Sequence, residues 1–309
     1  MKKFNEIFID KTKYGEKIQT SEYEKQGKHI IVDQGQAEIA GYTNREEGLF
    51  NEVPVIIFGD HTRLIKYIDE PFFLGADGVK VLRSKEKNAN YKYLYYALKS
   101  AKIPNTGYNR HFKWLKDVEI NYPDSVKQEK IVDILDRVSD VIEKRKAELS
   151  YLDTLIKARF VEMFGDPIRN TQNRPTTEFI NVVKMQRGFD LPVQDRQQDG
   201  EIPVYGSNGA LDYHNVAKIH GGVITGRSGT IGKVFYTEGD FWPLNTSLFS
   251  ADTHGNNVIY LGYLLQLFDL TRFVEGTGVP TLNRNMFHNK QIIDVPIDER
   301  DSLPLSSTR

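Results

Sequence analysis

Residues 127–163 of the chain read KQEKIVDILDRVSDVIEKRKAELSYLDTLIKARFVEM and contain neither proline nor glycine. Most of these residue types favour a helix. Apolar residues recur at alternating steps of four and three, which is the heptad pattern of a coiled-coil seam. They are Ile131, Leu135, Val138, Ile142, Leu149, Leu152, Ile156 and Met163. A helix over this stretch spans roughly 55 Å at about 1.5 Å per residue, so we expect one strand of a coiled coil or a spacer between two bodies.

Two arginines, Arg145 and Arg159, occupy seam positions in this pattern. A long basic side chain at such a position can extend along the helix surface to solvent. It can instead pair with an acidic residue of a partner helix and fix the register, at a cost in stability. Pairing is the favoured interpretation for Arg145, because the apolar pattern resumes directly after it.

The composition limits the classes of protein to consider. The chain has 309 residues, which is room for two domains, and it contains no cysteine, which excludes disulfides and thiol nucleophiles. No apolar run is long enough to cross a membrane and the first residues do not form a signal peptide, so we expect a cytoplasmic protein. The formal net charge is −1, and residues 1–123 carry 20 Lys+Arg against 17 Asp+Glu. A nucleic-acid-binding protein of this composition must gather its cations locally.

The segments before and after the long helix repeat the same blocks in the same order. The paired blocks are 4–8 with 179–183, 29–42 with 202–213, 55–60 with 223–227, 93–98 with 260–265, 109–110 with 283–284, and 119–123 with 293–296. Short apolar runs between turn residues predict mostly β domains, each with one clear helix, near 90–100 and 258–271. A duplication with a purely structural purpose is the alternative interpretation.

The repeat predicts a domain organisation. We expect an α+β chain with a first domain over 1–123, the long helix over 124–164, a second domain over 165–297 and a short polar tail over 298–309. Pro123 leads into the long helix, and Pro296 begins a similar stretch that soon turns polar. We therefore expect the second copy of the long helix to be missing.

In this order, the motifs resemble the specificity subunit of a Type I restriction-modification enzyme. The resemblance covers nearly the whole chain and rests on the PxxxxQEKI motif from Pro123 to Ile131, the end of the helix from Phe160 to Pro167, the loop GRSGTIG from Gly226 to Gly232, and the Asn-Arg pairs before each closing strand. The chain departs from the family pattern in lacking a distal helix to pack antiparallel against the first.

The resemblance implies two homologous, mostly β target recognition domains joined by a long coiled-coil helix. It also implies a non-catalytic DNA-binding subunit that reads a bipartite site, with one domain for each half-site. The helices of this family dock modification (methyltransferase) and restriction (motor and nuclease) subunits. S-adenosylmethionine, ATP and Mg²⁺ would belong to these partners, and the chain itself would hold no cofactor or metal.

Loops of both domains carry residue types that can read DNA bases, because Arg can form paired hydrogen bonds with guanine and Asn or Gln with adenine. The loop with the clearest pattern of this kind spans 225–233 in the second domain, and its counterpart in the first domain spans 59–64. Asp60 is a possible acceptor from cytosine, and Ser247 closes a turn or touches a groove. Structural turns with solvated polar side chains remain the alternative throughout. The candidate DNA contacts are Gln34, Gln36, His61, Thr62, Arg63, Asn105, Tyr108, Asn109, Arg110, Ser207, Asn208, Arg227, Ser228, Thr230, Lys233, Thr246, Thr277, Thr281, Asn283 and Arg284.

Motifs for intrinsic catalysis are absent from the sequence. Five residues separate Gly226 from Gly232, and Val234 follows Lys233, so this loop does not fit the phosphate-binding pattern. No amino-methyltransferase motif is present, no Glu-x-Lys follows Pro123, and no histidines stand at metal-ligand spacing. The alternative to a DNA-recognition subunit is a structural adaptor that binds protein partners and dimerises through the helix. The unpartnered seam Ile131–Met163 predicts self-association in either case.

Overall fold

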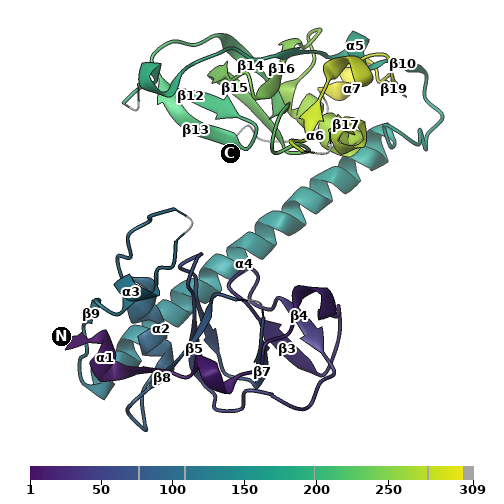
Figure 1. The fold of residues 1–309 in the computed structure, drawn as a ribbon. Coiled ribbons are helices and arrows are strands. Elements are labelled where there is room, and N and C mark those ends of the chain that lie inside the picture. The colour runs from purple at the N-terminus through teal and green to yellow at the C-terminus, as the bar shows by residue number, and fades with distance from the viewer. Residues whose placement is uncertain (76, 108, 198, 277, 302–309) are drawn as a thin grey trace. The chain divides into compact units, whose positions relative to one another are not determined.

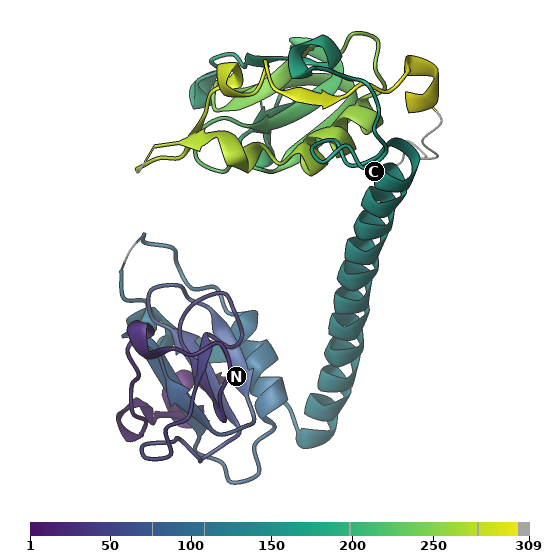
Figure 2. The same ribbon diagram turned by 90° about the vertical axis from the view of Figure 1, so that its right-hand side faces the viewer.

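The computed structural model describes residues 1–301 except 76, 108, 198 and 277 (Figure 1). The chain divides into two compact units, Met1–Lys146 and Ala147–Arg309. Helix α4 (Ser125–Phe164) runs through the boundary without interruption for 40 residues (Figure 2). The predicted long helix is therefore confirmed, and it extends slightly beyond the periodic stretch at both ends.

The first unit contains two small sheets, with strand orders β2-β8-β5-β6 and β4-β3-β7. The strands are β2 (Phe8–Asp10), β3 (His29–Val32), β4 (Gly41–Thr43), β5 (Val55–Gly59), β6 (Ile65–Ile68), β7 (Phe72–Leu74) and β8 (Val79–Ser84). Every residue of β5 is buried, as its continuous apolar run predicts for a central strand.

Short helices and a two-stranded ribbon complete the first unit. They are β1 (Lys2–Lys3), paired with β9 (Glu119–Ile120), the helices α1 (Phe4–Ile7), α2 (Tyr91–Lys99) and α3 (Phe112–Leu115), and the 3₁₀ turns η1 (Thr12–Tyr14) and η2 (Thr20–Glu22). The Asn90 side chain accepts a hydrogen bond from the Tyr93 backbone N–H at 3.0 Å and so begins α2. Asp136 of α4 accepts hydrogen bonds from Lys92 and Tyr96 of α2, at 2.6 and 2.7 Å. The start of α4 is thereby fixed to the first unit.

The second unit is built around a six-stranded sheet of order β11-β16-β14-β15-β12-β13. Its strands are β11 (Lys184–Arg187), β12 (Ile202–Gly206), β13 (Gly209–His214), β14 (Ile219–Gly226), β15 (Val234–Pro243) and β16 (Ser247–Asp252). The remaining elements are β10 (Thr176–Glu178), α5 (Phe179–Val182), η3 (Val193–Asp195), α6 (Val258–Phe268), η4 (Leu270–Phe273), β17 (Val274–Glu275), β18 (Thr281–Leu282), η5 (Arg284–Met286), β19 (Gln291–Ile293) and α7 (Ile297–Arg300).

The topology of the two units confirms the internal repeat. The ribbon β10–β19 repeats β1–β9, and β14 lies between β16 and β15 as β5 lies between β8 and β6. The parallel pair β3–β7 is repeated by β12 with the end of β15, where Val204 is in register with Trp242. The long strand β15 of the second unit thus occupies both positions that β6 and β7 occupy in the first unit.

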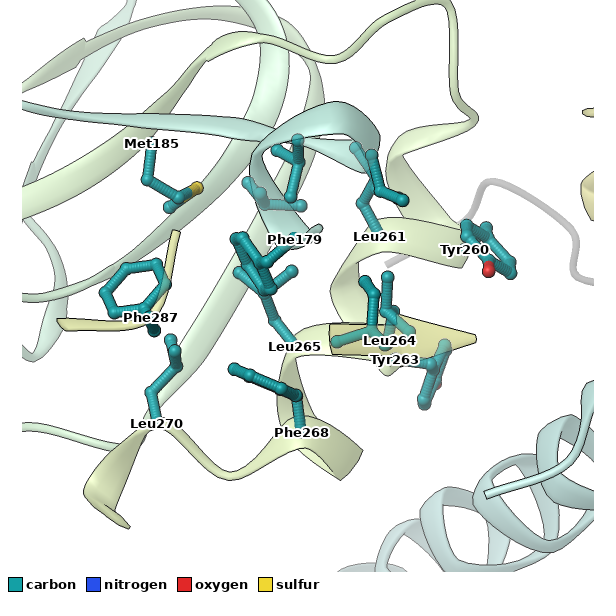
Figure 3. Packing of buried hydrophobic residues seen from close by; sticks show 14 of the residues in the cluster. Phe179, Met185, Tyr260, Leu261, Tyr263, Leu264, Leu265, Phe268, Leu270 and Phe287 are labelled. Atoms are coloured by element: carbon teal, nitrogen blue, oxygen red, sulfur yellow. The ribbon is translucent and has the colours of Figure 1, made fainter. Parts of the chain in front are cut away.

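Each unit has its own hydrophobic core beside its main helix. In the second unit, α6 is apolar except for Gln266, and its side chains pack against Phe179, Met185 and Phe287 (Figure 3). Phe160 and Phe164 of α4 belong to the same core. In the first unit, Val132 of α4 is buried in the core that surrounds α2.

The seam of α4 is exposed only in its middle. Val138, Ile142, Leu149 and Leu152 are 44–55% exposed, and every residue from 140 to 152 is exposed. At the two ends, Ile131 packs against the first core, and Ile156 and Met163 pack against the second. Arg159 pairs with Glu162 of the same helix at 2.8 Å. The unpartnered part of the predicted seam is therefore shorter than its sequence pattern.

Candidate nucleic-acid interface

In the first unit, the loops after β3, β5 and β7 meet the segment that precedes α3. The backbone N–H of Gly75 donates to the Val32 carbonyl at 2.8 Å, and that of Asp60 donates to the Gly78 carbonyl at 2.7 Å. The guanidinium of Arg63 donates to the Ile103 carbonyl at 3.3 Å. These contacts bring the four segments together at one edge of the unit, and three of them carry candidate residues from the sequence.

Gln34 joins three of these segments. Its side-chain N–H donates to the Asp77 carbonyl at 3.0 Å, and its side-chain oxygen accepts from the His61 backbone N–H at 3.1 Å. Its backbone carbonyl accepts from the Thr62 hydroxyl at 2.7 Å. Gln34 and Thr62 therefore use these hydrogen-bonding groups within the unit. Gln36 is exposed to solvent.

Asp60 does not fit the expectation that it accepts from cytosine. It is 3% exposed, and its carboxylate accepts from the Phe112 backbone N–H at 2.7 Å. Its carbonyl accepts from the backbone N–H of His111, a fully buried residue, also at 2.7 Å. Asp60 therefore fixes the start of α3 to the end of β5, and a backbone partner satisfies its buried charge.

The other candidates of the first unit lie around this framework. His61 and Arg63 are half-buried, and Asn105, Asn109 and Arg110 are exposed. The Lys17 ammonium, 2.5 Å from the Asp77 carboxylate, and the nearby Arg110 together hold the pKa of Asp77 below its usual value. Tyr108 lies outside the described residues. The loops that meet at this edge therefore carry the cations Arg63 and Arg110 and the amides of Asn105 and Asn109.

Lys66 is a residue of this edge that the sequence interpretation missed. It is 7% exposed, and its ammonium donates to the Ala37 carbonyl at 2.6 Å and lies 3.7 Å from Asp33. Burial lowers the pKa of Lys66. The ammonium ties the β3–β4 loop to β6. The signal that could have identified Lys66 is its place within the otherwise apolar strand 65–68, since a charge in such a strand is expected to be buried and hydrogen-bonded.

We predict that replacing Gln34 by Met will weaken recognition of the first half-site about tenfold. Methionine fills similar space but removes two hydrogen bonds, each worth about 1 kcal/mol. Gln34→Glu keeps the acceptor for His61 but loses the donor to Asp77, so its effect should be intermediate. The measurement is duplex affinity, with Gln26→Met, at an exposed site, as the control. Unchanged affinity for the Gln34→Met variant would show that the loops hold their geometry without this bridge.

The second unit repeats the arrangement around the β14–β15 loop. The backbone N–H groups of Arg227 and Ser228 donate to the Thr246 carbonyl at 2.8 and 3.1 Å. The Leu282 N–H donates to the Arg227 carbonyl at 2.8 Å, and Ser228 forms a β-bridge with Thr281. The loop after β14, the turn before β16 and the segment around β18 are therefore one framework, in the topological positions of the first unit.

Lys233 and Asn208 meet across this framework. The Lys233 ammonium donates to the Asn208 side-chain oxygen at 2.7 Å, and both residues are exposed. Asn208 lies in the two-residue turn Ser207–Asn208 between β12 and β13. The repeat predicted that these two loops are equivalent to those holding Gln34 and His61, and they are likewise neighbours.

The remaining candidates of the second unit differ in exposure. Thr246 and Asn283 are exposed, while Thr230 and Arg284 are half-buried. The Asn283 side chain accepts from the Asn285 N–H at 3.1 Å and begins η5. Ser247 is fully buried and donates to the Leu244 carbonyl at 2.7 Å, so it closes the turn and does not touch a groove. Thr277 lies outside the described residues.

Gly226 is the point of closest packing in the loop. A Cβ atom added there would overlap the carbonyl oxygen of Thr230 and lie 3.0 Å from that of Ser207. Since these atoms are backbone, the loop would have to move. We predict that Gly226→Ala will lower affinity for the second half-site at least tenfold while the first half-site is read normally, measured with duplexes altered in one half. Gly278→Ala is the matched control, because its Cβ would meet nothing within 4 Å.

Two observations on the described residues concern the β14–β15 loop and groups of possible metal ligands. The loop Arg227–Lys233 joins two strands, whereas a phosphate-binding loop leads from a strand into a helix. The described residues contain no group of three or more His, Cys, Asp or Glu side chains that could hold a metal ion. Among these residues, no helix combines the length and apolar content of a membrane span.

Comparison with known proteins identifies the family. Residues 1–151 and 170–302 match the Type I restriction modification DNA specificity domain. A stretch of 133 residues, 39% of this chain and only 33% of the relative, is 29% identical to the Type I restriction enzyme EcoR124I/EcoR124II specificity subunit of Escherichia coli.

The fold resembles the crystal structure of the Type-I restriction-modification system S subunit from M. genitalium, with a TM-score of 0.57, 18% identity, and coverage of 98% of this chain and 86% of that one. The HsdS subunit from Thermoanaerobacter tengcongensis aligns at a TM-score of 0.37, with 13% identity and coverage of 89% and 80% of the two chains. Since the two family matches together span most of the sequence, the chain belongs to the family of Type I restriction-modification specificity subunits and carries two DNA specificity domains.

Proposed function

We propose that the chain reads a bipartite DNA site, with one half-site for each unit, as the non-catalytic recognition subunit of a modification and restriction complex. The observation that carries the proposal is the matched pair of loop clusters. In both units, the loops at equivalent strand ends bring cations, amides and hydroxyls together in one framework of exposed and half-buried side chains. Two equivalent frameworks in one chain suit a site with two separated halves.

The chemistry of each cluster favours direct reading of bases combined with phosphate contacts. Arg227 and Lys233 of the second unit and Arg63 and Arg110 of the first can bind phosphates or guanine. Backbone bonds within each cluster fix the loops before DNA arrives, so less conformational entropy is lost on binding. S-adenosylmethionine, ATP and Mg²⁺ would be held by partner subunits.

We also propose that the exposed middle of α4 docks these partners or a second copy of the chain. Val138, Ile142, Leu149 and Leu152 present an apolar stripe to solvent. Ile134, Val141 and Leu155 widen it on one side and are 58–64% exposed. Helical stripes of this kind bury themselves against other helices.

The test is co-expression with a modification subunit, followed by genome-wide mapping of methylated bases. The expected result is methylation at one discontinuous sequence. Arg227→Ala should relax the base requirement in one half of that sequence, and Arg63→Ala in the other half. Absence of site-specific methylation together with no duplex binding at low salt would refute the proposal.

A further inference from the structure

The strands β12 and β13 of the second unit form a hairpin that contains a β-bulge (Figure 1). Val204 is in register with Asp212, whereas the next residue of β12, Tyr205, is in register with Ala210. Leu211 therefore lies between these two pairs as the extra residue of β13. A bulge changes the direction of side chains relative to the regular alternation of a strand, and Ala210 and Leu211 are accordingly both exposed.

The bulge places the Leu211 side chain, which is 53% exposed, within the loop cluster of the second unit. A Cβ atom added at Gly206 would overlap Leu211 Cδ2 and would lie 3.7 Å from the Thr246 hydroxyl oxygen. The leucine and threonine side chains are therefore neighbours beside this glycine. The Thr246 carbonyl accepts from the backbone N–H groups of Arg227 and Ser228, so the methyl groups of Leu211 lie next to the β14–β15 loop.

The backbone on both sides of the bulge is held by the rest of the sheet. The Leu244 backbone N–H donates to the Tyr205 carbonyl at 2.8 Å and ties the end of β12 to the turn before β16. A Cβ atom added at Gly209 would lie 3.1 Å from the Phe235 ring, so the beginning of β13 packs closely on β15. Because this backbone is fixed in advance, a contact made by Leu211 costs little ordering of the chain on binding.

The chemistry of Leu211 differs from that of the polar candidates around it. Arg227 and Asn208 offer hydrogen-bonding groups, which can read the nitrogen and oxygen atoms at the edges of bases. Leu211 offers only methyl groups, and covering them with another apolar group is favourable. In the major groove, thymine differs from the other bases by its C5 methyl group, which proteins read through apolar contact.

We infer that Leu211 contacts the C5 methyl group of a thymine in the second half-site, so that the chain requires a T·A pair at that position. This role of Leu211 rests on the proposed reading of DNA and adds a specificity-determining residue to the polar candidates. An apolar surface of a protein partner is the competing occupant. DNA is favoured because Leu211 lies beside Thr246 and the loop of Arg227, which are themselves candidate DNA contacts.

The test uses the full chain with its modification subunit and duplexes that carry the site found by methylation mapping. Each thymine of the second half-site is replaced in turn by deoxyuridine, which lacks only the methyl group. One replacement should weaken binding of the parent chain about fourfold, as expected for the loss of one buried methyl group. The Leu211→Ala chain should bind the thymine and uracil duplexes equally. The Leu211→Met chain, which keeps an apolar side chain of similar length, should remain sensitive to the methyl group.

Val216→Ala is the matched control, because Val216 is 52% exposed and follows the end of β13 that is remote from the turn at 207–208. This variant should respond to deoxyuridine as the parent chain does. Deoxyuridine in the first half-site should affect the parent and Leu211→Ala chains equally.

Three results would overturn the inference while specific duplex binding still upheld the proposed function. The second half-site could contain no thymine whose methyl group matters, the Leu211→Ala chain could be as sensitive as the parent, or Leu211→Met could lose the sensitivity as fully as Leu211→Ala. Weaker binding of the modification subunit by Leu211→Ala, with unchanged sensitivity to deoxyuridine, would identify a protein contact instead. A parent chain that showed neither site-specific methylation nor duplex binding would overturn the proposed function as well.

Discussion

Replacing Phe160 by alanine is expected to lower the free energy of unfolding of the second unit by about 3–5 kcal/mol. Phe160 is fully buried, and its ring contacts both Phe164 and Tyr260. Removing the ring leaves a cavity in a densely packed core, since the surrounding aromatic residues can relax only partly. Denaturant unfolding in a Trp114→Phe background, where Trp242 of the second unit is the sole tryptophan, measures the loss by fluorescence.

Leu155→Ala is the control on the same helix, because Leu155 is 64% exposed. Its effect should stay below about 1 kcal/mol, as for most surface substitutions. A loss of less than 1 kcal/mol for Phe160→Ala would show that the end of α4 is not part of the second core.

Replacing Leu149 and Leu152 together by aspartate is expected to abolish assembly through α4 and leave both units folded. The two leucines are 55% and 44% exposed in the single chain, so the charges remain hydrated there. In a helix–helix interface the same carboxylates would be buried without partners, at a cost of several kcal/mol. Light scattering of the chain alone and mixed with a modification subunit measures the change in mass.

The matched control places two aspartates on the opposite side of the same helical turn, as Ser150→Asp and Tyr151→Asp. These residues are exposed and lie outside the heptad seam. The control should assemble normally, with unfolding transitions like those of the parent chain. Equal assembly of both double variants would exclude the seam as the docking surface.

The architecture was largely predictable because it depends on periodicity and repetition. The alternating steps from Ile131 to Met163 predict a long helix, and the matching blocks predict two units of one topology. The pattern could not reveal that Val132 and Phe160 are among the residues of α4 that are buried in the two cores. Both lie one position beyond the seam, and only tertiary packing selects which side of an amphipathic helix each unit covers.

The candidate interface was predictable as a set of loops but not in the roles of single side chains. The repeat offset pairs the loop of His61 with that of Arg227, and the strands place each beside its predicted neighbours. Residue type identifies Gln34 and Asp60 as hydrogen-bonding groups, but it does not say whether the partner is DNA or backbone. Whether the loop residues contact bases stays a prediction.

The bonds of Gln34 bear on how recognition by the first unit changes over generations. A substitution that adapts one loop to a new base also moves the loops bonded to it. A single exchange would therefore weaken the DNA contacts that those other loops already make. New specificities would then be reached more easily by replacing the entire unit, which has its own core, than by a series of point changes. An engineer who wishes to retarget the chain should accordingly exchange the whole first unit, Met1–Lys146, as a block.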